Sequence, residues 1–203
     1  MRRPSKFFDA MRSGLMAPTL DNNEVSGSNA ILEAMEGLPI AWCAYALATA
    51  FHETAHTMQP IKEYGGDKYF TRMYDITGAR PTLARKMGNT TAGDGPKYCG
   101  RGYVQLTWKS NYLKAGQKLN IDLASNPDLA MNADIAALIL RHGMREGWFT
   151  GRGFQHFLPA SGPATEAQFQ AARKIINGTD KQALIANYAV EFQKALQAGG
   201  WPT

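Results

Sequence analysis

The sequence has only two cysteines in 203 residues, Cys43 and Cys99. Two thiols are too few for a disulfide framework or for a zinc site built from thiolates. Cys43 lies in an apolar run and is expected to be a small core residue, whereas Cys99 stands beside a glycine turn. A disulfide between the two is not expected in a chain that is synthesised in the cytosol.

The sequence also lacks any run of about 18 consecutive apolar residues, so no transmembrane helix is expected. The basic start Met1-Arg2-Arg3 is not followed by the unbroken apolar stretch of a secretory leader, because Asp9 and Arg12 interrupt it. We therefore expect synthesis in the cytoplasm without a signal peptide. No Pro/Ser-rich linker is present, and residues 1–203 are expected to form one domain.

The charge of the chain does not identify a binding partner. The net charge is +5 and the sequence pI is about 9.2, but Lys and Arg are scattered along the chain. Such a balance favours polyanions in general, among them acidic cell-wall polymers, and a solvated basic surface is the alternative explanation. Hydrophobic residues make up 44% of the chain and charged residues 19%, which is typical of globular proteins.

Apolar residues at three- and four-residue spacing predict a mainly helical fold, without strand–helix alternation or a long internal repeat. The expected helices cover residues 6–16, 26–36, 39–56, 111–119, 134–146, 166–176 and 180–198, with short ones near 68–74 and 81–87. Residues 103–108 are expected to form a short strand or an extended loop. Glycine accumulates between residues 63 and 101, and this irregular stretch is expected to form the wall of a cleft.

The stretch His52-Glu53-Thr54-Ala55-His56 permits two chemical interpretations. Two histidines one helical turn apart can bind zinc, and Glu53 would then be the general base of a metallohydrolase. A third ligand is needed, and Lys62 stands where the metzincin pattern has histidine, which leaves Glu63 or Asp75 as acidic ligands. Alternatively, Glu53 is a carboxylic acid on an apolar helix, where desolvation favours the protonated form that can protonate a leaving group.

A glycosidase also needs a second carboxylate in a wetter environment, where it activates water. Glu63 meets this requirement, because it follows Pro60 on a glycine-flanked loop. Arg173 and Arg101 are candidates for pairing with one of the two carboxylates, which would keep that carboxylate ionised. A surface arginine is the alternative at each position.

Four blocks of sequence follow one another along most of the chain. They are His52-Glu53-Thr54, Tyr98–Thr107 with Asn111-Tyr112, Asn126–Leu129 and Ile175–Gly178. In this order and at these distances they resemble the family 19 glycoside hydrolases. Within that family the short, cysteine-poor chain is more similar to phage endolysins than to plant chitinases, notably in Met58–Glu63 and in Phe7-Phe8-Asp9.

The resemblance implies a lysozyme-like fold of two helical lobes with a substrate groove between them. It implies that Glu53 is the general acid and Glu63 the general base of an inverting mechanism, with Thr107 holding the attacking water. The substrate-binding residues that it implies are His52, Tyr103, Gln105, Asn111 and Asn177. Amides can hydrogen-bond N-acetyl and hydroxyl groups, and aromatic rings can cover sugar faces. His56 is expected to be a packing residue.

The substrate that we expect is bacterial peptidoglycan, cleaved at the β-1,4 bond between N-acetylmuramic acid and N-acetylglucosamine, with chitin as the alternative polymer. A zinc metallopeptidase and a non-catalytic wall-binding protein of the same fold are alternatives from other classes. We expect a monomer with no cofactor, no metal, no nucleic-acid partner and no separate wall-binding domain. As a bacteriolytic enzyme of phage lysis, it would reach the wall in the periplasm after another protein permeabilises the membrane.

Overall fold

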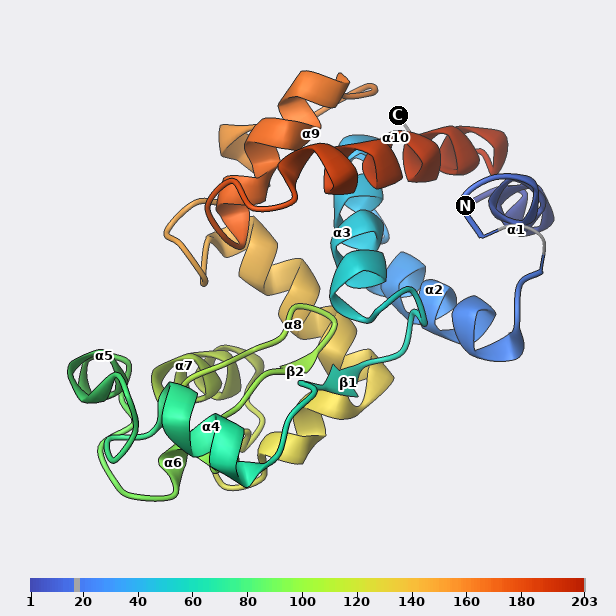
Figure 1. Ribbon diagram of the computed structural model, residues 1–203. Helices are drawn as coiled ribbons and strands as arrows, with labels where there is room; N and C mark the ends of the chain where they lie inside the picture. Colours follow the sequence, from blue (N-terminus) through green and yellow to red (C-terminus); the bar gives the residue numbers. More distant parts are fainter. Residues whose placement is uncertain (17–18, 203) are drawn as a thin grey trace. The chain divides into compact units, whose positions relative to one another are not determined.

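The computed structural model describes residues 1–16 and 19–202 (Figure 1). Helices dominate, and the sheet found in this part of the chain has two short strands, so the predicted mainly helical class is confirmed. The chain separates into two compact units: unit 1 comprises Met1–Gln59 and Leu140–Thr203, and unit 2 comprises Pro60–Ile139. No helix of the described residues is both long and apolar enough to cross a membrane.

Unit 1 is built around one buried helix, α3. Its elements are α1 (Pro4–Ser13), α2 (Asn22–Ala34), α3 (Ile40–Glu53), the end of α8 (Ala133–Glu146), η2 (Phe154–His156), α9 (Glu166–Ala172), η3 (Arg173–Ile175) and α10 (Gln182–Ala198). Helix α10 packs against α3, and α9 and α1 pack against α10 (Figure 1). Eleven of the 14 residues of α3 are buried, most of them alanine or larger apolar residues, so this helix supplies the core of unit 1.

Helix α3 ends at Glu53, whereas the apolar pattern predicted that it would continue through His56. Thr54 terminates it, because its hydroxyl donates to the carbonyl of Ala50 at 2.8 Å and accepts the backbone N–H of Met58 at 3.1 Å. His56 and Met58 then have positive φ angles, which no helix contains. The chain therefore turns sharply just after Glu53.

Two further predictions on helices are corrected. Helix α2 begins before Ser26, because Asp21 and Glu24 form a reciprocal capping box at its start. In α10, the four-residue spacing of Leu184, Tyr188, Phe192 and Leu196 predicts one buried row, but Leu184 is 40% exposed, and Ile185 is the buried residue at this turn. The predicted inward face of α10 is therefore correct at Phe192 and Leu196 and wrong at Leu184.

Unit 2 contains more regular structure than expected between residues 63 and 101. Its elements are β1 (Ile61–Lys62), α4 (Asp67–Tyr74), α5 (Pro81–Lys86), α6 (Asp94–Lys97), β2 (Arg101–Gly102), α7 (Lys109–Leu119), η1 (Pro127–Met131) and the start of α8 (Ala133–Glu146). Strands β1 and β2 pair antiparallel, with Ile61 opposite Gly102. Helix α6 was not predicted, since its four residues include a glycine and a proline.

A buried carboxylate holds the glycine-rich part of unit 2 together. Asp75 is 1% exposed and accepts four hydrogen bonds, from the backbone N–H groups of Thr77, Gly93 and Gly95 and from the Thr77 hydroxyl. Burial by itself raises the pKa of Asp75, but these hydrogen bonds, that from Gly95 foremost, outweigh it and lower the pKa. Asp75 thus fastens the loop before α6 to the end of α4.

We expect Asp75→Asn to lower the free energy of unfolding by about 2–3 kcal/mol at neutral pH, because an amide NH₂ would face backbone donors that need an acceptor. Since the folded pKa is lowered, the contribution of Asp75 is complete above its unfolded pKa of about 4 and is lost as the pH falls through the folded pKa. The variant should therefore lose less stability on acidification than the parent. Denaturant unfolding at several pH values measures this.

The matched control is Glu33→Gln, the same change at an exposed carboxylate of α2. It should change the free energy of unfolding by no more than about 0.5 kcal/mol. Equal stability of the Asp75→Asn variant and the parent at neutral pH would contradict the assigned role.

Candidate functional site

The residues that the sequence singled out divide between the two units. Unit 1 contains His52, Glu53, Arg173 and Asn177. Unit 2 contains Glu63, Arg101, Tyr103, Gln105, Thr107 and Asn111. Each set is described within its own unit.

In unit 1, Glu53 is paired with a buried arginine. Glu53 is the last residue of α3, and its side chain is 19% exposed. Arg173 donates from Nη1 to Glu53 Oε1 at 3.1 Å, while its Nε donates to the carbonyl of Asp180 at 3.0 Å. The Arg173 side chain is 4% exposed, so its charge is compensated mainly by this one carboxylate. Arg173 thus binds Glu53, the glutamate expected to be the acid, whereas the sequence suggested such a pairing for a carboxylate that acts as a base.

The position of Arg173 follows from the local sequence. Helix α9 begins at the capping box formed by Thr165 and Gln168, and it passes into the 3₁₀ turn η3, which contains Arg173. The backbone N–H of Asn177 donates to the Arg173 carbonyl at 2.9 Å and closes this turn. Asn177 is exposed, and its side-chain oxygen accepts the N–H of Gly178 at 2.8 Å. Asn177 therefore lies at the surface, four residues beyond Arg173.

The two histidines of the 52–56 stretch have different environments. His52 lies on α3, and its pKa is lowered chiefly by burial, although the neighbouring carboxylate of Glu53 opposes this effect. His56 lies past the end of the helix, stacks on the ring of Phe51 at 4.2 Å and has Nε2 at 3.2 Å from the Tyr188 hydroxyl. The packing role expected for His56 is confirmed.

This geometry does not match the zinc interpretation, which needs both imidazoles on one face of a continuous helix. His56 has a φ of 73°, so the helical spacing is broken before it. Within residues 1–16 and 19–202, no group of three or more His, Cys, Asp or Glu side chains has an arrangement suited to a metal ion.

In unit 2, hydrogen bonds fix both oxygens of Glu63. Oε1 accepts the hydroxyl of Tyr74 at 2.8 Å, and Oε2 accepts the backbone N–H of Gly100 at 3.1 Å. The backbone N–H of Glu63 also donates to the Gly100 carbonyl at 2.8 Å, which continues the pairing of β1 with β2. A Cβ at Gly100 would lie 2.8 Å from Gln105 Oε1 and 3.1 Å from Glu63 Oε2. Only glycine fits between these two side chains without a shift.

Sequence reasoning did not identify Tyr74, which it treated only as the end of a short helix. The pKa of Tyr74 is raised, first by burial and then by the hydrogen bond to Glu63, so the hydroxyl keeps its proton and donates it. The ring of Trp108 contacts Tyr74 edge-on at 5.0 Å. The sequence contains no signal for this contact, because the tertiary position of α4 brings Tyr74 to Glu63.

The three polar residues after β2 are all held by backbone carbonyls. Gln105 donates from its amide to the carbonyls of Ile61 and Gly102, both at 3.1 Å. The Thr107 hydroxyl donates to the Gln105 carbonyl at 2.8 Å, and the Asn111 amide donates to the Thr107 carbonyl at 2.8 Å. Thr107 is half-buried, and its oxygen remains able to accept a hydrogen bond from water.

Two residues of unit 2 do not match their predicted roles. Tyr103 is fully buried, and burial raises its pKa to about 12, so its ring offers no face to a sugar in this structure. Arg101 is 4% exposed and binds Asp128 at 2.8 Å, with further bonds to the Cys99 carbonyl and the Tyr112 hydroxyl. It therefore braces the fold and does not pair with Glu63.

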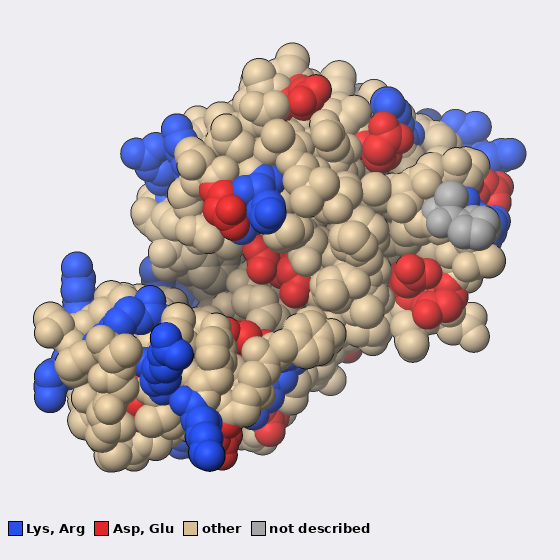
Figure 2. Space-filling model, in the orientation of Figure 1, with Lys and Arg blue, Asp and Glu red and all other residues tan. Residues whose placement is uncertain are grey.

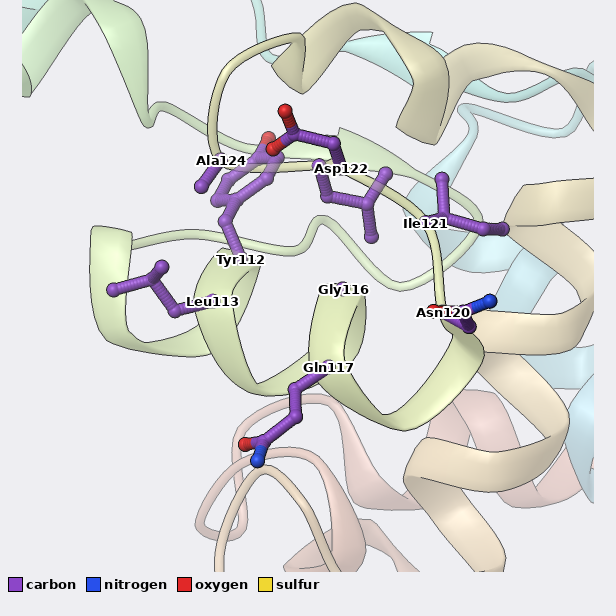
Figure 3. Close-up of a pocket in the computed structure, with 9 residues that line it drawn as sticks. Tyr112, Leu113, Gly116, Gln117, Asn120, Ile121, Asp122 and Ala124 are labelled. Atoms are coloured by element: carbon purple, nitrogen blue, oxygen red, sulfur yellow. The ribbon is translucent and has the colours of Figure 1, made fainter.

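A cavity of about 460 Å³ lies elsewhere in unit 2, between α7 and the loop that follows it (Figure 3). The ring of Tyr112 extends from α7 toward this loop, but it is fully buried. Asp122, the one charged residue of the lining, accepts the N–H of Ser125. None of the predicted site residues lines this cavity.

The sequence model of a known family, described as chitinase class I, matches residues 41–149. This range includes Glu53, Glu63 and Thr107, and it ends before Arg173. Among curated proteins, a segment of 35 residues is 57% identical to an inactive chitinase-like protein 1 of Hevea brasiliensis, covering 17% of this chain and 11% of that protein. A segment of 41 residues is 46% identical to endochitinase 1 of Theobroma cacao, covering 20% and 13%. The matches therefore span a small part of these relatives.

Solved structures show the same fold over nearly the whole chain. Chitinase C of Streptomyces griseus superimposes with a TM-score of 0.60 at 21% identity, covering 100% of this chain and 78% of that chain. A bacterial family 19 chitinase superimposes with a TM-score of 0.56 at 24% identity, covering 98% and 95%. The predicted lysozyme-like helical fold is thereby confirmed.

The Arg173–Glu53 pair should be energetically coupled. We expect Arg173→Met to lower the free energy of unfolding by about 3 kcal/mol, because it leaves a partly buried carboxylate without its cation. Combining it with Glu53→Gln should cost less than the sum of the two single changes, by about 1 kcal/mol or more. A double-mutant cycle from denaturant unfolding measures this coupling, and strict additivity would contradict it.

Proposed function

This chain belongs to the chitinase class I family, glycoside hydrolase family 19, and on that basis we propose that it hydrolyses β-1,4 bonds of peptidoglycan between N-acetylmuramic acid and N-acetylglucosamine. The observation that supports the proposal is the partial exposure and the hydrogen bonding of two carboxylates within the region that the family model matches. Glu53 and Glu63 are both partly exposed, and each is held in place by hydrogen bonds from its own unit. Such a pair supplies the acid and the base that glycoside hydrolysis requires.

In the proposed inverting mechanism, Glu53 donates its proton to the glycosidic oxygen as the bond from that oxygen to the anomeric carbon breaks. Glu63 takes a proton from a water molecule, whose oxygen attacks the opposite face of the sugar. Thr107 would accept a hydrogen bond from that water. The mechanism requires both carboxyl groups to face one sugar ring, with room for one water between them.

The surroundings of the two carboxylates differ. Tyr74 and Gly100 both donate to Glu63, and donors stabilise a carboxylate that must act as a base. Glu53 has one charged donor, Arg173, and stands at the end of an apolar helix. Arg173 forms an ion pair with the Glu53 carboxylate, so Glu53 would have to take up a proton when substrate binds before it can act as the acid. Arg173 would then stabilise the carboxylate that remains after the proton has left.

Three alternatives have specific observations to weigh. Chitin remains the alternative substrate, because the named relatives include an endochitinase and chitinase C. A non-catalytic glycan-binding protein is a second alternative, since one relative is named as inactive. Retention of Glu53, Glu63 and Thr107 favours catalysis over binding alone. A zinc metallopeptidase is disfavoured by the position of His56 beyond the end of α3.

The setting of the reaction is part of the proposal. We propose that residues 1–203 act as one catalytic domain and as a monomer, with peptidoglycan glycan strands as the partner. By its resemblance to phage endolysins, the protein would act on the wall in the periplasm after another protein permeabilises the membrane. His52, Gln105, Asn111 and Asn177 would contact the sugars.

Glu53→Gln and Glu63→Gln should each lower kcat on purified peptidoglycan by a factor of about 100 or more, because each removes a group that transfers a proton. Release of reducing ends measures the rate. Near-normal activity in either variant, with a folded chain, would reject the assigned role of that residue.

Two controls accompany this experiment. The melting temperature of each variant shows whether loss of activity reflects loss of the fold. Treatment with EDTA should leave the parental rate unchanged, whereas a loss that zinc restores would favour the metallopeptidase interpretation. Glycan binding by the parent without any release of reducing ends would favour a binding protein.

Reducing-end release from peptidoglycan and from chitin, measured side by side with the parental chain, should be faster on peptidoglycan. The expected reason is that the excess positive charge of the chain favours a wall polymer with carboxylates over neutral chitin. The difference should shrink at high salt, which screens charge. Faster hydrolysis of chitin at low and high salt alike would make the chain a chitinase.

A further inference from the structure

Most of the excess positive charge of the chain belongs to unit 2. Unit 2 has 11 Lys and Arg against seven Asp and Glu, whereas unit 1 has 11 against ten. Three acids of unit 2 are engaged within the unit: Asp75 accepts four hydrogen bonds, Asp94 binds Lys109, and Asp128 binds Arg101. Lys and Arg are divided equally between the two units, whereas Asp and Glu are fewer in unit 2. Unit 2 therefore carries most of the net positive charge.

One stretch of unit 2 is especially basic. Between residues 68 and 93 the single acid is the buried Asp75, whereas the exposed bases are Lys68, Arg72, Arg80, Arg85 and Lys86. Arg80 donates to the Met73 carbonyl and lies over the Tyr74 ring. The side chains of the other four make no hydrogen bond or ion pair with the described part of the chain. Figure 2 shows Lys and Arg side chains gathered over the part of the surface that α4 and α5 occupy in Figure 1.

An open surface pocket of about 530 Å³ lies within this basic surface. Its lining consists of Asp67, Lys68, Thr71 and Arg72 from α4, and Thr77, Gly78 and Ala79 from the turn beyond it. Gly78 permits this closeness, because a Cβ there would overlap the carbonyl oxygen of Thr71. The volume lies within the usual range of small-ligand sites, about 300–1,000 Å³.

We propose that this pocket, which we call the α4 pocket, binds the peptide stem of peptidoglycan through its carboxylates. Lys68 and Arg72 stand one helical turn apart on α4, so their cationic groups can approach one ligand from the same side. This inference rests on the proposed function for its choice of ligand. The peptide stem carries the charge by which peptidoglycan differs from chitin.

The composition of the lining favours a peptide over a phosphate polymer. A peptide stem presents carboxylates, which Lys68 and Arg72 can bind, and amide N–H groups, which need acceptors. Asp67 supplies an acceptor in the same lining. A phosphate polymer presents acceptors along its backbone, and the Asp67 carboxylate would repel it.

The α4 pocket is connected to Glu63 through α4 itself. The same helix contains Lys68 and Arg72 of the pocket and Tyr74, whose hydroxyl binds Glu63 at 2.8 Å. Helix α4 spans eight residues, about 12 Å, so a stem attached near a glycan bound at Glu63 has a short distance to cover. The pocket would thus select strands that carry stems.

The test is a titration of the intact chain with the free peptide stem, released from purified wall by an amidase. This probe has no glycosidic bond, so its binding is measured without hydrolysis. We expect binding that weakens at high salt, and the double variant Lys68→Ala/Arg72→Ala should bind at least about tenfold more weakly, as expected for the loss of charge-assisted hydrogen bonds. Both side chains are exposed, so the variant should retain the parental melting temperature.

The matched control is Arg85→Ala/Lys86→Ala, which removes two charges from α5, outside the pocket. It should bind the stem within about twofold of the parent. It removes the same number of charges as the first variant, so a difference in binding between the two variants reflects the position of the charges and not the net charge. An equal loss in this control would overturn the pocket assignment, as would no binding of the stem by the parent. Tighter binding of inorganic polyphosphate, dependent on Lys68 and Arg72, would also overturn it in favour of a phosphate polymer.

Failure of this inference is distinguishable from failure of the proposed function. A chain that releases reducing ends from peptidoglycan but does not bind the stem lacks the α4 pocket function alone. A chain that binds the stem through Lys68 and Arg72 but releases no reducing ends contradicts the hydrolase proposal, and the pocket assignment then stands.

Discussion

The end of helix α3 is the constraint on which unit 1 depends. Eleven of its 14 residues are buried, so the core fixes the direction and the depth of the helix. The helix then ends at Thr54, whose hydroxyl donates to the Ala50 carbonyl and accepts the N–H of Met58. Glu53 is therefore presented from the last position of a rigid element, where its carboxylate meets the buried Arg173. If α3 continued to His56, then His52 and His56 would lie on one face of the helix, as the zinc interpretation requires.

The second carboxylate, that of Glu63, is positioned by different interactions. Glu63 is held by backbone pairing with Gly100 and by a tyrosine hydroxyl, and no cation binds it among the described residues. Its environment is made of neutral donors from a glycine-rich segment, whereas that of Glu53 contains a buried cation. The Asp75 carboxylate supports this arrangement indirectly, because it anchors the loop before α6 to the end of α4.

The uneven placement of acids gives unit 2 a local positive charge that the net charge of the chain does not express. An overall charge of +5 indicates only a mild preference for anions. In unit 2 Asp75 is buried and Asp94 and Asp128 are paired, which leaves Asp67 as the one acid of α4 and α5 beside the four exposed bases Lys68, Arg72, Arg85 and Lys86. The charge therefore acts locally, near a pocket on the helix that also supports Glu63.

The sequence alone determined the helical class and the family, and it predicted the two glutamates, because hydrophobic spacing and short ordered motifs are local properties of the chain. It also indicated Arg173 as a partner for a carboxylate. Only the tertiary structure decided which carboxylate Arg173 binds, where α3 ends, and that Tyr103 and Arg101 are buried. Tyr74 and the α4 pocket likewise arise from contacts between segments distant in sequence or across a turn, and the spacing of residues along a chain does not encode such contacts.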